Sequence, residues 1–216
     1  MFDSLKECGA YVIGEVKLRS PFGKSLTKNS FDEQLELADK ISWMISIPTD
    51  KNLGGSFEDV ARARKRTKKK ILAKGLHGTD DAISRLLDLG ADYVLVVGRI
   101  PNVHIDKCFI EPLTLAELSE IPSNGSCWAV WNSRDLSSWK DLPGIPEFLL
   151  ERWKRMELDG TQALKKETFK QAREAFGGPL CQASNLTTKA DIEPGADAVL
   201  VGSNLETFAA SLGVTL

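Results

Sequence analysis

Short apolar runs rich in β-branched residues recur along this chain, and stretches with helical spacing of apolar positions separate most of them. This alternation is typical of a parallel sheet whose crossovers are helices. The strand-like runs cover residues 11–17, 41–47, 70–74, 93–97, 108–111, 126–131, 180–183 and 198–201. The helical patterns cover residues 31–40, 57–67, 80–89, 115–121, 143–158 and 165–176, with a last one from Asn204.

Eight strands with crossovers in 216 residues predict an α/β fold, namely a compact (β/α)8 TIM barrel formed by one domain over residues 1–216. A doubly wound open sheet is the structural alternative. Two stretches depart from the regular alternation of strands and helices. Residues 98–107 are too few for a crossover helix, so a loop or a single turn should make the fourth crossover. Residues 143–158 predict an extra helix after the sixth strand.

The composition is that of a globular protein, with 42% hydrophobic and 27% charged residues and a net charge of −2. No apolar run is long enough to span a membrane, and the charged start does not match a signal peptide, so we expect a cytoplasmic protein without a membrane partner. The four cysteines are dispersed and only two histidines are present, so no zinc site is expected.

Three features of the sequence have ordinary structural explanations. The basic run at residues 62–70 is expected to be a solvated helix end, and without an aromatic stacking platform it predicts no nucleic-acid partner. His77, in a loop after the third strand, is interpreted as a hydrogen-bonding bystander. Trp128 and Trp131 are expected to pack against the outer helices.

Charged and polar residues stand where apolar strands should end. Charges there would be costly in a core, but in an α/β barrel this is the mouth of the active site. Glu15 and Lys17 are two apart and therefore point the same way. A close lysine and carboxylate can act as proton donor and acceptor, whereas the simpler interpretation is a set of surface ion pairs. The strand-end residues concerned are Glu15, Lys17, Lys74, Glu111, Asn132 and Arg134.

The last two strands predict a phosphate site. The eighth strand runs into Gly202 and Ser203 before a helix, where free backbone N–H groups can bind an anion. Ser184, after the seventh strand, should lie beside them, and barrels often bind phosphate between these two loops.

In chain order these pieces resemble indole-3-glycerol phosphate synthase, a (β/α)8 enzyme of the tryptophan pathway. The motifs that carry the resemblance are Glu15-Val-Lys17 with Ser20-Pro21, Thr49-Asp50 with Gly54-Gly55-Ser56, Lys74, Ile110-Glu111, Asn132-Ser-Arg134-Asp-Leu136 and Val201-Gly202-Ser203.

The resemblance implies a carbon–carbon lyase that needs no cofactor or metal. Members of that family close the ring of 1-(2-carboxyphenylamino)-1-deoxyribulose 5-phosphate and lose carbon dioxide and water. It implies that Lys74 is the general acid and that Glu111 is the base or proton partner in the dehydration. It also implies that Lys17 contacts the anionic groups of the substrate and helps the acid chemistry. Glu15 and Asn132 would orient the lysines and the sugar hydroxyls of the substrate. The implied substrate-binding residues are Arg134, Ser20, Ser184, Gly202 and Ser203.

The chain also departs from the family pattern. Leu53 and Leu76 stand where aromatic residues pack on the substrate ring, and Ala183 and Asn185 replace a glutamate and a glycine of the seventh strand end. Asn185 can replace that glycine because asparagine tolerates positive φ. These changes keep two alternatives open: a diverged paralogue acting on another sugar phosphate, or a non-catalytic phosphate-ligand-binding barrel. The expected partner is a small phosphorylated molecule, and the protein is expected to be a monomer or homodimer.

Overall fold

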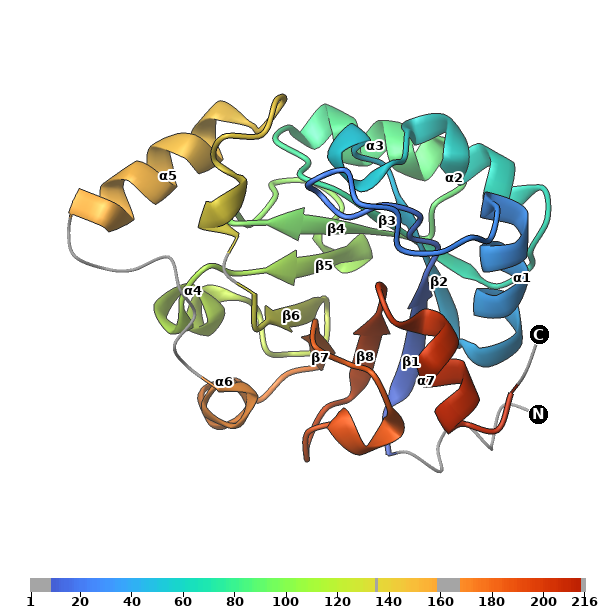
Figure 1. The fold of residues 1–216 in the computed structure, drawn as a ribbon. Helices are drawn as coiled ribbons and strands as arrows, with labels where there is room; N and C mark the ends of the chain where they lie inside the picture. Colours follow the sequence, from blue (N-terminus) through green and yellow to red (C-terminus); the bar gives the residue numbers. More distant parts are fainter. Residues whose placement is uncertain (1–8, 135, 159–167, 215–216) are drawn as a thin grey trace.

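The structure is a computed structural model that describes residues 9–134, 136–158 and 168–214. Eight parallel strands close into a barrel in sequence order, which confirms the predicted TIM-barrel class and excludes the open sheet (Figure 1). The strands are β1 (Tyr11–Glu15), β2 (Met44–Pro48), β3 (Lys70–Lys74), β4 (Tyr93–Val97), β5 (Cys108–Glu111), β6 (Trp128–Asn132), β7 (Leu180–Ala183) and β8 (Ala198–Val201).

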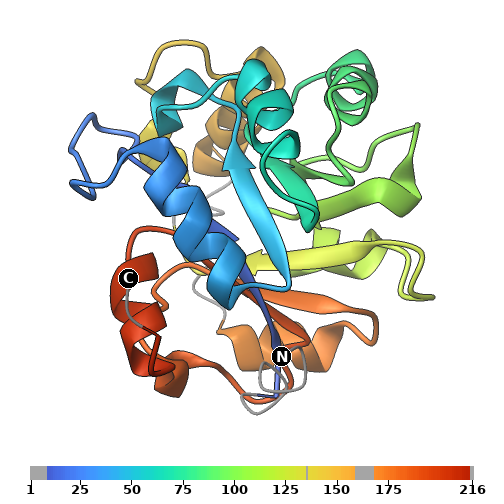
Figure 2. The ribbon, with the colours of Figure 1, turned by 90° about the vertical axis from the view of Figure 1, so that its right-hand side faces the viewer.

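Helices cover the outside of this barrel (Figure 2). They are α1 (Phe31–Ile41), α2 (Phe57–Arg64), α3 (Asp80–Asp88), α4 (Leu115–Glu120), α5 (Glu147–Leu158), α6 (Phe169–Ala175) and α7 (Leu205–Ser211). No described helix combines the length and the apolar character needed to cross a membrane. The loop between β1 and α1 projects from the body of the molecule in Figure 2.

Strand alternation sorts the side chains into two apolar layers. On β3, Ile71 and Ala73 point outward and pack with the helices, while Leu72 points into the barrel. Lys70 and Lys74 share the inward side with Leu72, one at each end of the strand. The same period places Glu15 and Lys17 on the inner side at the carboxyl end of β1.

An aromatic cluster fills the amino-terminal end of the barrel and corrects one prediction. Trp128 stacks on Phe109 with ring centroids 5.2 Å apart and an interplanar angle of 4°, and the ring centroid of Trp43 lies 6.1 Å from that of Trp128. Trp131 packs in the outer layer as predicted. The prediction for Trp128 was wrong, because two residues three apart on a strand face opposite sides.

Some element boundaries differ from the predicted ones. Ile41 is the last residue of α1 rather than the first of β2, because the N–H of Ser42 still donates to the carbonyl of Ala38. The strand pairing begins two residues later, where the N–H of Trp43 donates to the carbonyl of Val12. Helix α6 begins at Phe169, and the predicted residues 165–167 lie outside the described part of the chain.

The two irregular stretches meet at the carboxyl ends of β4 and β5. Between these strands the chain forms one short 3-10 helix, η3 (Ile105–Lys107). Helix α5 lies on the side toward which the arrowheads of β4 and β5 point in Figure 1. Its residues Leu149, Trp153 and Met156 are buried and join the barrel-interior cluster. The inserted helix is therefore part of the wall at the barrel mouth.

Candidate active site

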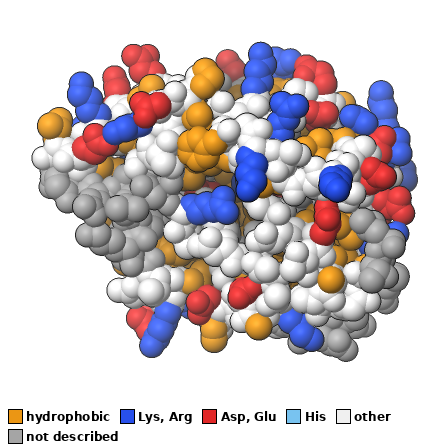
Figure 3. All heavy atoms as spheres, in the orientation of Figure 1, with side chains coloured by type: hydrophobic (Ala, Val, Ile, Leu, Met, Phe, Trp, Pro, Cys, Tyr) orange, Lys and Arg blue, Asp and Glu red, His pale blue; other side chains and the backbone are white. Residues whose placement is uncertain are grey.

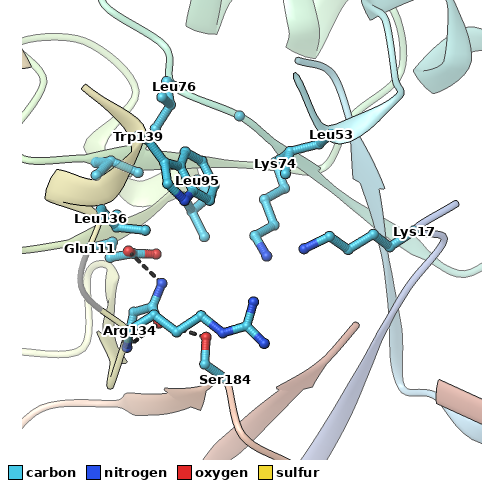
Figure 4. Close-up of a pocket in the computed structure, with 13 residues that line it drawn as sticks. Lys17, Leu53, Lys74, Leu76, Leu95, Glu111, Arg134, Leu136, Trp139 and Ser184 are labelled. Carbon is cyan, nitrogen blue, oxygen red and sulfur yellow. Dashed lines mark hydrogen bonds between the residues drawn. The ribbon is translucent and has the colours of Figure 1, made fainter. Parts of the chain in front are cut away.

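The ends of β1 and β3 bring two lysines and a carboxylate together. Lys74 Nζ lies 2.9 Å from Glu15 Oε2, in an ion pair whose side chains are 17% and 1% exposed. Lys17 is also buried, at 7% exposure, and its ammonium faces that of Lys74 in Figure 4. One carboxylate is thus shared between two cations in a poorly solvated place.

Burial and charge set the protonation of this group. Burial alone would raise the pKa of Glu15, but the charges of Lys74 and Lys17 outweigh it and lower that pKa from 4.5, so Glu15 is ionised at neutral pH. Burial lowers the pKa of Lys17 from 10.5, against the opposing attraction of Glu15, and Lys74 lowers it further. Lys17 therefore gives up its proton more readily than a free lysine does.

Gly202 has a steric role here in addition to the predicted one. A Cβ atom on Gly202 would overlap with the carboxylate of Glu15 and lie 3.5 Å from Cδ of Lys17. The missing side chain at the end of β8 therefore leaves the space that the Glu15 carboxylate occupies.

A second group spans the ends of β5, β6 and β7. Asn132 donates from Nδ2 to Glu111 Oε1 at 2.9 Å, and its Oδ1 accepts from Ser184 Oγ at 2.6 Å. The backbone N–H of Arg134 also donates to Asn132 Oδ1, at 3.0 Å. Glu111 and Asn132 are buried, at 2% and 7% exposure. Asn132 thus fixes the direction of the Glu111 carboxylate through a network that crosses three strands.

One pocket lies between these two groups and has an apolar side (Figure 4). Lys74, Glu111 and Arg134 line its polar side. The apolar wall is made by Leu53, Leu76, Leu95, Leu136 and Trp139. Such a wall accepts a flat, uncharged ring next to the charged groups.

Sequence reasoning missed Trp139. It belongs to η4 (Ser137–Trp139), a 3-10 turn in the loop after β6. It follows Leu136, the last residue of the Asn132 motif, by three positions, which is the signal that could have found it. An aromatic side chain is therefore present in this pocket, although Leu53 and Leu76 are aliphatic.

The other end of the site is polar and carries positive charge. A neighbouring pocket shares Lys17, Lys74, Arg134 and Ser184 with the first. Its other lining residues are Glu15, Leu200 and the loops after β7 and β8, which include Asn185, Gly202 and Ser203. The charged residues that line the two pockets carry one net positive formal charge. They are the three cations Lys17, Lys74 and Arg134 and the two carboxylates Glu15 and Glu111. Figure 3 shows Lys and Arg side chains beside a central hollow on this face. This end suits an anion.

The loop after β7 holds an unusual backbone. Ser184 and Asn185 both have positive φ, at 71° and 57°. Asn185 thus adopts the left-handed conformation that its replacement of glycine predicted, while the strain at Ser184 was not foreseen. Such conformations in non-glycine residues persist where surrounding contacts hold them, often at functional sites. Here the hydrogen bonds from Ser184 to Asn132 and from Asn185 to Ser133, at 3.0 Å, hold the turn.

The predicted substrate-binding residue Ser20 and the bystander His77 both lie apart from the pockets. Ser20 sits in a turn, where its Oγ accepts from the N–H of Lys24 at 3.1 Å, and it lines neither pocket. His77 is buried 3.3 Å from Thr49 Oγ1, and burial with the charge of Arg99 lowers its pKa to about 4. Within the described ranges, no three His, Cys, Asp or Glu side chains gather as metal ligands would.

Fold and site together define an α/β barrel with a charged, partly apolar cavity at the carboxyl ends of its strands. Sequence comparison confirms the resemblance that the strand-end motifs predicted. The chain is 33% identical over 151 residues to indole-3-glycerol phosphate synthase of Aquifex aeolicus (strain VF5), covering 63% of this chain and 59% of that protein. It therefore spans less than two thirds of that relative's length.

A structural comparison bears on the fold, and a search with protein-family profiles bears on the family. The crystal structure of citrate synthase SbnG superposes with a TM-score of 0.53 and 13% sequence identity, covering 93% of this chain and 89% of that one. At this identity the likeness concerns the barrel alone. No protein-family profile matches the chain.

Proposed function

We propose that this protein is a lyase of the indole-3-glycerol phosphate synthase type, which closes an indole ring with loss of carbon dioxide and water. The observation that carries the proposal is the placement of Lys74 and Glu111 on one pocket, between an apolar wall and a positively charged end. The proposed substrate, 1-(2-carboxyphenylamino)-1-deoxyribulose 5-phosphate, has a flat ring, a carbonyl and a phosphate in that order along its length.

In the proposed reaction Lys74 is the general acid. As the ring carbon that bears the carboxylate attacks the ribulose carbonyl, the Lys74 ammonium protonates the carbonyl oxygen, and the carbonyl becomes a hydroxyl group. The ring carbon then loses carbon dioxide and recovers its aromaticity. The ion pair with Glu15 supports this role, because the buried carboxylate holds the ammonium at the site before it transfers its proton.

Glu111 is the proposed base of the second half of the reaction. It accepts a proton from the new five-membered ring, the Lys17 ammonium donates the proton with which the hydroxyl group leaves as water, and the indole double bond forms. Asn132 supports this assignment by orienting the Glu111 carboxylate at 2.9 Å. Lys17 and Arg134 would attract the anionic groups of the substrate, and Ser184, Gly202 and Ser203 would bind its phosphate.

A kinetic comparison of two lysines tests the proposal. Purified protein is mixed with the proposed substrate, and indole fluorescence is followed. Lys74→Ala should lower kcat by roughly 10²–10⁴, the effect of losing a general acid. Lys70→Ala is the matched control on the same strand, because Lys70 Nζ lies at the other end of the barrel, 5.3 Å from the Trp43 and Tyr93 rings. Full activity of Lys74→Ala, or no indole formation by the wild type, would overturn the assignment.

One observation favours a second candidate, a paralogue with the same acid–base pair and another sugar phosphate as substrate. The inward position at the end of β7 is Ala183, so this strand contributes no carboxylate to the site. A panel of sugar phosphates separates the two candidates: turnover of the ring-bearing substrate alone supports the synthase, and turnover of another compound supports the paralogue.

A further inference from the structure

The inserted helix α5 contacts the chain at the carboxyl-terminal end of β4 through Arg152, which lies outside both site pockets. The guanidinium of Arg152 donates from Nη1 to the carbonyl of Gly98 and from Nη2 to Glu117 Oε1. Gly98 follows the last residue of β4, and Glu117 lies in the first turn of α4. Arg152 thus ties three separate elements together at the barrel mouth.

Both contacts lead to the backbone of Glu111 or to the segment that directly follows it. The N–H of Gly98 donates to the carbonyl of Glu111 at 2.8 Å. The other oxygen of Glu117, Oε2, accepts from the N–H of Leu113 at 2.8 Å. Arg152 therefore holds Gly98, which is hydrogen-bonded to Glu111 across the sheet. Through Glu117 it also holds Leu113, which lies two residues after Glu111.

Packing reinforces this link. A Cβ atom on Gly98 would lie 2.7 Å from Leu149 Cδ2 and 3.3 Å from Leu113 Cδ1, so α5 rests directly on this strand end. Gly98 has a φ of 69°, a conformation that glycine adopts freely. The crossover between β4 and β5 contains only η3, and so it offers little helical support of its own to these strand ends.

We propose that Arg152 is a positioning residue for Glu111: through Gly98 and Glu117 it holds the end of β5 where the Glu111 carboxylate meets Asn132 and the pocket. This inference rests on the proposed function for its catalytic consequence. An arginine suits the task because its planar fork donates in two directions at once, which a lysine ammonium on a flexible chain cannot reproduce with the same geometry.

The test compares three variants in the indole-forming assay. Arg152→Ala should lower kcat about 10- to 100-fold, since a misplacement near 1 Å can cost 10²-fold. KM should stay within about twofold, because Arg152 lines neither site pocket. Arg152→Lys should recover part of kcat. Arg155→Ala, on the exposed side of the same helix, is the matched control and should behave as the wild type.

A purely structural role gives a different result. In that case Arg152→Ala lowers Tm while the folded enzyme keeps its kcat, and the proposal is overturned. If Arg152→Ala does not fold, Glu117→Gln serves instead. The amide oxygen of the glutamine can still accept from the N–H of Leu113, while the negative charge that attracts Arg152 is removed. Glu117→Gln should then lower kcat in the same way, and an unchanged kcat would also overturn the proposal.

A crystal structure of the Arg152→Ala variant, or of Glu117→Gln in its place, separates this inference from the proposed function. If the wild type forms no indole, the proposed function fails, and the variant structure still decides the positioning role. Loss of the 2.9 Å hydrogen bond between Asn132 and Glu111 supports positioning, and its retention with an unmoved β5 end refutes it.

Discussion

Lys74 donates a hydrogen bond of 2.9 Å to Glu15 across the end of β2, which separates their two strands. The second oxygen of that carboxylate, Oε1, is buried and has no hydrogen-bond partner among the described residues. The attraction of the lysines, rather than hydrogen bonds to both oxygens, therefore keeps Glu15 ionised despite its burial. This has a measurable consequence for stability.

We expect the Glu15 pair to make the fold sensitive to acid. Because the pKa of Glu15 is lower in the folded protein than its ordinary value of 4.5, the unfolded chain binds more protons between those two values. The stabilisation is therefore complete above pH 4.5 and is lost as pH falls through the folded pKa. Glu15→Gln should show a shallower loss of Tm below pH 4.5, measured by thermal unfolding. Parallel Tm curves for the two proteins would contradict this.

Glu111→Gln should remove the base and keep the network. The amide oxygen of glutamine can still accept from Asn132 Nδ2, so the geometry is retained while the proton acceptor is lost. We expect kcat to fall by roughly 10²–10⁴ with an unchanged Tm. Glu120→Gln, an exposed position of α4, is the control. A Glu111→Gln enzyme with wild-type kcat would assign the base elsewhere.

Trp139 should determine how well the ring end of the substrate binds. Trp139→Ala removes an aromatic wall, and a loss of about 1.4 kcal/mol would raise KM about tenfold. Trp139→Phe keeps a flat ring and should stay close to the wild type. Inhibition by inorganic phosphate reports on the polar end, which Trp139 does not line, and it should be equal in all three proteins. An unchanged KM in Trp139→Ala would remove Trp139 from the binding wall.

The loop after β7 should respond to backbone strain at Asn185. Asn185→Val places a β-branched residue at a φ of 57°, which costs about 1–2 kcal/mol. For a chain of this size that corresponds to a drop in Tm of about 2–8 °C. Asn185→Gly is the matched control, because both variants lose the hydrogen bond to Ser133 and only glycine fits this φ without strain. Equal Tm values for the two variants would show that the loop relaxes.

The sequence by itself determined the barrel and its charged rim. Period-two alternation on β1 and β3 predicts which side chains point inward, and strand-like runs of four to seven residues mark the strands. Polar residues at the carboxyl ends of those runs then predict a shared mouth, because parallel strands in a closed barrel all end there. For this reason the sequence alone predicts that Glu15, Lys74, Glu111 and Asn132 share one site.

Only the tertiary structure decided what surrounds that site. The pairing of Lys74 with Glu15 depends on the curvature of the closed sheet, which brings the ends of β1 and β3 within ion-pair distance. The contribution of Trp139 and the link from Arg152 to Gly98 depend on where an irregular loop and an inserted helix come to rest. A periodic pattern specifies the face of an element that is buried, but the neighbour that covers it is set by contacts between residues far apart in the chain.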